Sequence, residues 1–150
     1  MTRQTASIVI SVAVLALWSL AAPATGTTSS PRINYMLHCQ GCHLADGSGT
    51  PDKVPALKHE VGRFVHVPGG REYLIQVPGT SQSALTDAEV AAVLNWILES
   101  FSAAELPVDF TPYSTDEVSR LRRPPLANVS AVRAGLMARI SANEAGVTTE

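Results

Sequence analysis

The chain has 150 residues, of which 45% are hydrophobic and 16% charged, and its formal net charge is −2 at pH 7. This length suits one domain and is too short for two domains of ordinary size. Its longest basic run is Arg122-Arg123, which argues against binding to nucleic acid.

The first 24 residues have the organisation of a secretory signal peptide. Arg3 gives a positive start, residues 8–20 are mostly apolar, and Ala22-Pro23-Ala24 places small residues where a signal peptidase cleaves. An uncleaved membrane anchor is the alternative, but the apolar run is shorter than the roughly 20 residues that a spanning helix needs. We therefore expect a periplasmic protein that starts after Ala24, with no membrane span once the signal is removed.

A helix is expected from about residue 32 up to a cysteine motif. Ser30 and Pro31 are typical of its start, as a capping residue followed by proline at the first helical position. Ile33 and Leu37 share one face of this helix, which we expect to pack inward.

The helix leads into Cys39-Gln40-Gly41-Cys42-His43, the C-x-x-C-H pattern of covalent haem attachment. Positions i and i+3 lie on the same side of a helical turn, so both thiols can reach the vinyl groups of one porphyrin. His43 then follows closely enough to bind the iron.

Three other uses of a cysteine pair compete with haem c. A thioredoxin-like pair needs a surrounding βαβ pattern, which is not visible, and a structural zinc site needs about two further ligands at suitable spacing. A disulfide between Cys39 and Cys42 would leave His43 without a role. The export signal upstream and helical patterns on both sides favour one covalently bound haem c.

Residues 35–49, YMLHCQGCHLADGSG, resemble the haem-binding start of class I bacterial monohaem cytochromes c. The resemblance covers roughly residues 33–101 and includes LTDAEV at residues 85–90, which is similar to the start of the last helix in that family. It implies an all-α fold, in which a small cytochrome c domain surrounds one haem and carries electrons. The two terminal helices of that domain would cross beside the haem.

The elements after the motif follow from local patterns. Residues 46–55 are rich in Gly, Ser, Thr, Asp and Pro and predict a loop. Short helices are expected within residues 57–67 and over residues 71–77, the second closed by Pro78-Gly79. The strongest helix starts at the capping box of Thr86 and Glu89, and its helically spaced apolar residues continue to Phe101.

The predicted cytochrome c domain covers residues 25–102, and residues 103–150 form a C-terminal extension that packs on the core or on a partner. Residues 106–112 are interrupted by proline and are expected to be extended, and Ser114 starts a short helix that stops before Pro124. A last helix is expected over residues 129–142. Val129, Val132, Leu136 and Ile140 lie on one face of that helix.

The sixth iron ligand is not evident from the sequence. Class I cytochromes usually supply a methionine before the last helix of the domain, often followed by proline, whereas this chain has Val77-Pro78 there. His66 is the first candidate and His59 the second. An open or water-bound site, Lys53, Lys58 and Met137 are further alternatives, and either histidine could also simply be exposed. Two histidine ligands would lower the reduction potential relative to methionine ligation.

Three further side chains are candidates for the haem pocket. Arg71 follows two glycines and could pair with a haem propionate through its forked donors, although an ordinary surface role is an alternative. Tyr73 and Trp96 could wall the pocket, and simple core packing explains both equally well.

These features predict a periplasmic electron carrier, or an electron-transfer subunit, rather than an enzyme. A periplasmic dehydrogenase would be its donor, and an oxidase or another cytochrome its acceptor. The alternative is a haem enzyme, or a protein that binds gases or peroxide at an open sixth position.

Overall fold

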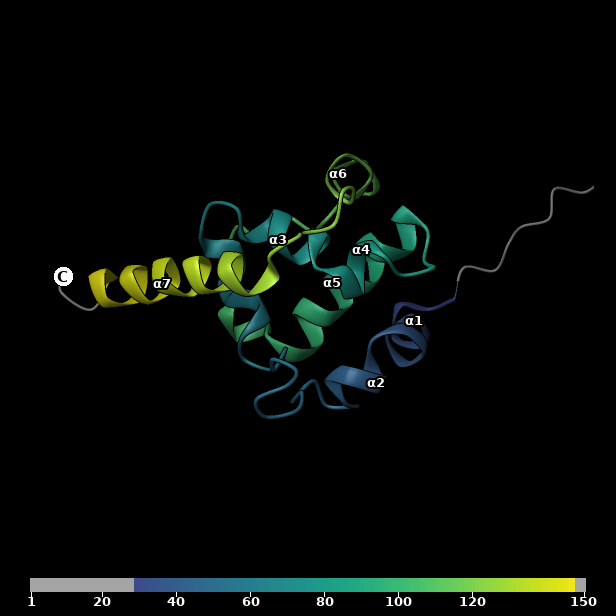
Figure 1. The fold of residues 1–150 in the computed structure, drawn as a ribbon, viewed down its shortest axis with the longest axis horizontal. Helices are drawn as coiled ribbons and strands as arrows, with labels where there is room; N and C mark the ends of the chain where they lie inside the picture. Colours follow the sequence, from purple (N-terminus) through teal and green to yellow (C-terminus); the bar gives the residue numbers. More distant parts are fainter. Residues whose placement is uncertain (1–28, 148–150) are drawn as a thin grey trace, which may run out of the picture.

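A computed structural model describes residues 29–147 as a set of helices packed around one core (Figure 1). The signal peptide expected over residues 1–24 lies outside the described residues. The all-α fold expected from the sequence is confirmed, and the described residues add to their helices only an isolated bridge between Thr50 and Val54. No helix among residues 29–147 is both long and apolar enough to cross a membrane.

The cysteine motif lies where two short helices meet. Helix α1 spans Pro31–His38 and α2 spans Gln40–His43, with Cys39 between them. The expectation that Ile33 and Leu37 pack inward is wrong, because they are 43% and 69% exposed. The buried face of α1 carries Asn34 and Tyr35 instead.

Helix α5 is the centre of the fold and spans Asp87–Phe101. Its predicted capping box is confirmed: the Thr86 hydroxyl accepts from the Glu89 amide, and the Glu89 carboxylate accepts from the Thr86 amide. Helices α1 and α6 both pack against α5. The contact between α1 and α5 is the one that the family resemblance implies.

Between α2 and α5 the chain forms a loop and three short helices. They are the 3₁₀-helix η1 (Val61–His66), α3 (Gly70–Gln76) and α4 (Pro78–Ser81). The helix predicted over residues 71–77 is confirmed as α3, which ends just before Pro78-Gly79. Pro78 also opens α4, because proline needs no hydrogen-bonding amide at the first position of a helix.

The C-terminal part begins with the 3₁₀-helix η2 (Ala103–Glu105) and continues with α6 (Thr115–Leu121) and α7 (Val129–Val147). Helix α7 lies along η1 and α3, and its far end extends away from the rest of the molecule (Figure 1). Leu136 and Ile140 are buried there, as the predicted face requires, but Val132 is 37% exposed. Helix α7 also continues five residues past the predicted end at residue 142.

Candidate cofactor site

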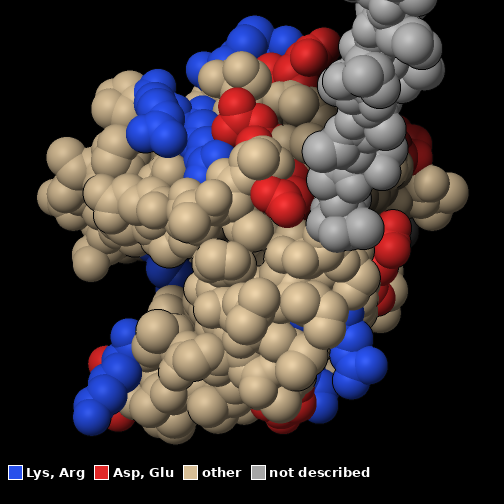
Figure 2. All heavy atoms as spheres, turned by 90° about the vertical axis from the view of Figure 1, so that its right-hand side faces the viewer, with Lys and Arg blue, Asp and Glu red and all other residues tan. Residues whose placement is uncertain are grey.

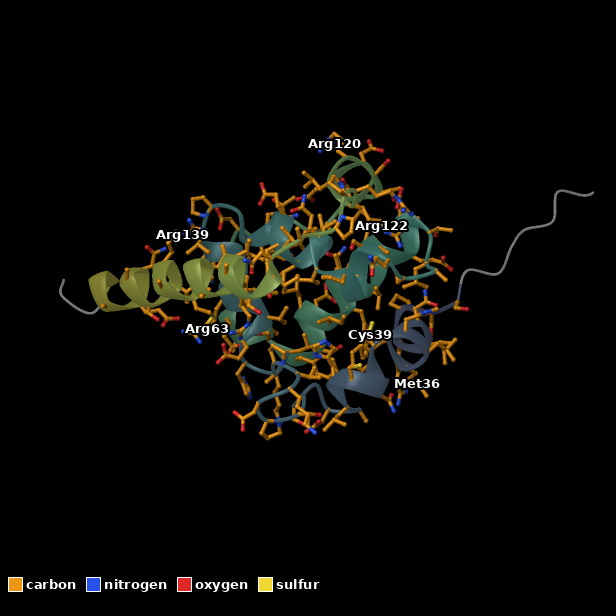
Figure 3. All side chains as sticks on the ribbon, viewed as in Figure 1. Met36, Cys39, Arg63, Arg120, Arg122 and Arg139 are labelled. Carbon is orange, nitrogen blue, oxygen red and sulfur yellow. The ribbon has the colours of Figure 1, made fainter. Side chains whose placement is uncertain are left out.

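The two cysteines are free thiols on consecutive turns of the chain. Cys39 is half-buried against the core and Cys42 is exposed. Figure 3 shows Cys39 on the inner side of α1, toward α5, and Met36 on its outer side. Burial, reinforced by the nearby Cys42, raises the pKa of the Cys39 thiol to about 11, so it is protonated at neutral pH.

His43 is held by backbone from outside its own helix. Its Nδ1 lies 3.1 Å from the carbonyl oxygen of Pro55. Because a carbonyl only accepts hydrogen bonds, this contact places the ring proton on Nδ1 and leaves the Nε2 lone pair free for a metal. Burial lowers the pKa of His43, which favours the neutral, ligating form of the ring.

The loop that presents Pro55 depends on a left-handed glycine. Gly49 has a φ of +67°, and its amide donates to the His43 carbonyl at 3.1 Å. A Cβ atom at this position would lie 2.4 Å from the Val54 carbonyl oxygen. Only glycine therefore fits this close approach between the two sides of the loop.

Three aromatic rings pack together on the side of α1 that carries Cys39. The Tyr35 ring centroid lies 5.2 Å from that of Trp96 and 5.1 Å from that of Phe101. The predicted pocket residue Trp96 is thus part of an apolar wall between α1 and α5, and its contact with a cofactor stays a prediction.

Tyr73 is buried on α3, where its ring stacks on Phe64 of η1 with centroids 5.1 Å apart. Burial raises the pKa of its phenol, and the nearby Arg133 acts in the opposite direction. The ring is well placed in the core, and its predicted role at a cofactor also stays a prediction.

Arg71 is turned toward the C-terminal part of the chain. Its Nε and Nη2 donate to the Glu117 carboxylate at 2.8 and 2.7 Å, and its Nη1 donates to the Thr111 carbonyl. The guanidinium also lies 4.1 Å from the ring centroid of Tyr113. The structure thus joins α3 to α6 through Arg71, and its predicted pairing with a propionate stays a prediction.

The two histidines considered as sixth ligands both contact Glu105. His66 Nε2 lies 2.7 Å from the Glu105 carbonyl oxygen, and His59 Nδ1 lies 3.1 Å from its carboxylate. Both side chains are exposed, and neither contact involves His43. Ligation by His66 stays a prediction, and it would require the ring to leave the Glu105 carbonyl.

The segment from Val77 to Thr86 is where a methionine ligand would be expected. It is short, and the buried Arg122 side chain is hydrogen-bonded to its backbone. Arg122 is 3% exposed, and it donates to the carbonyls of three residues in this segment and to the Asp87 carboxylate at 2.9 Å. Those carbonyls belong to Ser81, Ser83 and Leu85. No sequence pattern indicated this role, since Arg122 looks like half of a short basic run.

Pro55 is the other contributor that sequence reasoning missed. It acts through its carbonyl oxygen, which every residue type possesses, so no side-chain pattern could have marked it.

No family model matches this sequence. Two relatives do, both named cytochrome c-552 and both from Thermus thermophilus, the second from a specified strain of that species. Each is 35% identical to this chain over 102 residues, with 56% of this chain covered. The match covers 78% of the first relative and 69% of the second.

Proposed function

Because this chain belongs to the class I monohaem c-type cytochromes, we propose that it is a periplasmic electron carrier with haem attached at Cys39 and Cys42 and iron bound by His43. The single observation that carries this assignment is the contact between His43 Nδ1 and the Pro55 carbonyl. It leaves one imidazole nitrogen uncommitted beside two free thiols, and this donor set suits covalently bound haem.

Each of these side chains would have a separate task. The thiols of Cys39 and Cys42 would each form a thioether, and the loop around Pro55 would orient the His43 ring. When bound, haem supplies an iron that accepts one electron and releases it again. The apolar wall of Tyr35, Trp96 and Phe101 would keep water from one side of the cofactor.

The surface around the motif suits brief contact with another redox protein. Large exposed apolar side chains gather on α1 and just after α2: Ile33, Met36, Leu37 and Leu44. Figure 2 looks at this side of the molecule and shows a broad uncharged area with charged residues near its edge. Exposed apolar side chains on neighbouring turns are what a site of protein contact requires, and they support such a site here. We propose that the donor, a periplasmic dehydrogenase, and the acceptor, an oxidase or another cytochrome, meet this face in turn.

The division of the chain is part of the same proposal. Residues 25–102 would form the cytochrome domain, and residues 103–150 the extension. Packing of α6 on α5 and of α7 on η1 supports an extension that covers the domain.

Haem staining after denaturing electrophoresis tests the attachment, because only covalently bound haem survives denaturation. The protein is produced in a bacterium that makes c-type cytochromes, and wild type is compared with His43→Ala and His38→Ala. His38 is an exposed histidine one residue before Cys39, so it is a close control for His43. We expect the His38 variant to keep its haem and its spectrum, and the His43 variant to lose the low-spin spectrum or the haem itself. Equal behaviour of the two variants would contradict the assignment of His43.

A second function, binding of a gas or peroxide at an open sixth position, is favoured by one observation: both candidate histidines are engaged at Glu105. Carbon monoxide added to the reduced protein separates the two functions. Slow or absent binding supports a six-coordinate carrier, with His66 as the proposed ligand. Rapid binding that is unchanged in His66→Ala supports the open site.

A further inference from the structure

Arg133, on α7, differs from the other arginines that are at least partly buried in residues 29–147. Arg63, Arg71 and Arg122 each contact a carboxylate at 2.7–2.9 Å. Arg133 is also partly buried, yet it has no carboxylate within ion-pair distance in the part of the chain that the structure describes. A partly buried guanidinium is expected to pair with an anion, since burial without one is unfavourable.

The guanidinium of Arg133 lies against the core on one side. It lies 5.8 Å from the ring centroid of Phe64, which in turn stacks on Tyr73. Arg133 also lines a cavity of about 400 Å³, and the rest of that lining comes from the loop after the cysteine motif, at Ser48 and residues 50–56.

This cavity borders on the proposed iron site. Pro55 is one of its lining residues, and the Pro55 carbonyl is the group that holds His43. The charged residues that line it are Asp52, Lys53 and Arg133, so its net charge is positive. A positive cavity that shares Pro55 with the support of the His43 ring is suited to a carboxylate.

Haem carries carboxylates in a fixed place. Its two propionates lie on the edge of the macrocycle opposite the two groups that form thioethers. The cavity is lined by neither cysteine, but it adjoins the backbone that orients His43. We propose that Arg133, from the C-terminal extension, binds a haem propionate in this cavity, with Lys53 as a second cation. This inference rests on the proposed function, and it gives α7 a part in the cofactor site.

The reduction potential and its dependence on pH test this assignment. A propionate paired with Arg133 stays ionised, and its charge is compensated in both oxidation states of the iron. In Arg133→Gln the uncompensated anion favours the ferric state, so we expect a lower midpoint potential at pH 7. Without its cation, the pKa of the propionate should rise by about 1–3 units. The pH range in which the midpoint potential falls should therefore shift to higher pH by a similar amount.

Arg139→Gln is the matched control. Arg139 lies exposed on the same helix, and its replacement by glutamine removes the same positive charge (Figure 3). Its potential and pH profile should stay close to those of wild type. Arg133→Lys keeps the charge but loses the forked donors, so its profile should shift in the same direction by less. If Arg133→Gln does not fold, Arg133→Lys decides alone.

The inference would be overturned if the Arg133 variants, with haem attached, had the same midpoint potential and pH profile as Arg139→Gln. The proposed function would then still stand. A wild-type protein without covalent haem would overturn both, and the stained gel detects that result independently of any potential.

Discussion

The Nδ1 atom of His43 lies 3.1 Å from the carbonyl oxygen of Pro55, twelve residues further along the chain. The imidazole at the end of α2 is therefore oriented by a loop rather than by its own helix. A carbonyl at this nitrogen fixes which tautomer is present and leaves the other nitrogen available to a metal. Changes in the loop should consequently reach the cofactor without altering either cysteine.

Gly49→Ala should disrupt this loop. The alanine would adopt a φ of +67°, and its Cβ would lie 2.4 Å from the Val54 carbonyl oxygen. We expect a loss of about 1–3 kcal/mol in the free energy of unfolding, together with a lower yield of protein carrying haem. Denaturant unfolding and haem staining measure the two effects.

Gly79→Ala is the control for that substitution, because nothing lies within 4 Å of the Cβ position at Gly79. Its stability and haem content should match those of wild type. A Gly49→Ala protein with unchanged stability and full haem content would show that the loop does not depend on the left-handed glycine.

Arg122→Gln should destabilise the protein by about 3 kcal/mol, because it removes a buried cation from Asp87 and a donor from the carbonyls around α4. Arg120→Gln changes an exposed arginine two residues away on α6 and should have an effect below about 0.5 kcal/mol (Figure 3). Urea unfolding at pH 7 measures both variants. Similar stabilities for the two would mean that Arg122 does not hold the segment between α3 and α5.

Glu105 should make a pH-dependent contribution to stability. Hydrogen bonding from Ser102, with a smaller contribution from His59, holds the pKa of Glu105 below its ordinary value of 4.5. A carboxyl with a depressed folded-state pKa stabilises the protein above its unfolded pKa, and that stabilisation disappears as the pH falls through the folded value. The stability difference between wild type and Glu105→Gln should therefore be constant above about pH 5 and shrink below it.

The expected difference is small, below about 1 kcal/mol, because the Glu105 side chain is 23% exposed and the His59 side chain 68%. Urea unfolding at several pH values from about 7 to about 3 measures it, and Glu99→Gln, on the exposed side of α5, serves as control. A difference that stays constant over this range would contradict the role of the Glu105 carboxylate.

Local signals in the sequence predicted most of the helices, because the groups that cap or start a helix lie within a few residues of one another. The Thr86–Glu89 capping box and the Ser30-Pro31 start are of this kind, and both are present. The buried face of α1 was predicted wrongly, since Ile33 and Leu37 are apolar but exposed. Which face is buried depends on Tyr35 meeting Trp96 and Phe101 of α5, and sequence spacing within α1 does not contain that information.

The surroundings of the motif were also harder to predict, because their contacts join residues that are far apart in the sequence. The contact of Arg71 with Glu117, 46 residues further along the chain, has no signal in the sequence, and its pairing with a propionate stays a prediction. The sequence contains no signal for the role of Arg133, because its position near the Phe64 ring exists only once α7 lies along η1. Partners that come together through tertiary packing leave no periodic pattern in the chain.

Mass spectrometry of the protease-digested protein tests the central claim most directly. We predict one haem per chain, bound to the peptide that contains Cys39, Cys42 and His43, and its loss from that peptide when both cysteines are replaced by alanine. Recovery of this peptide with two free thiols, or with a disulfide, from protein matured in a host that makes c-type cytochromes would contradict the proposed attachment.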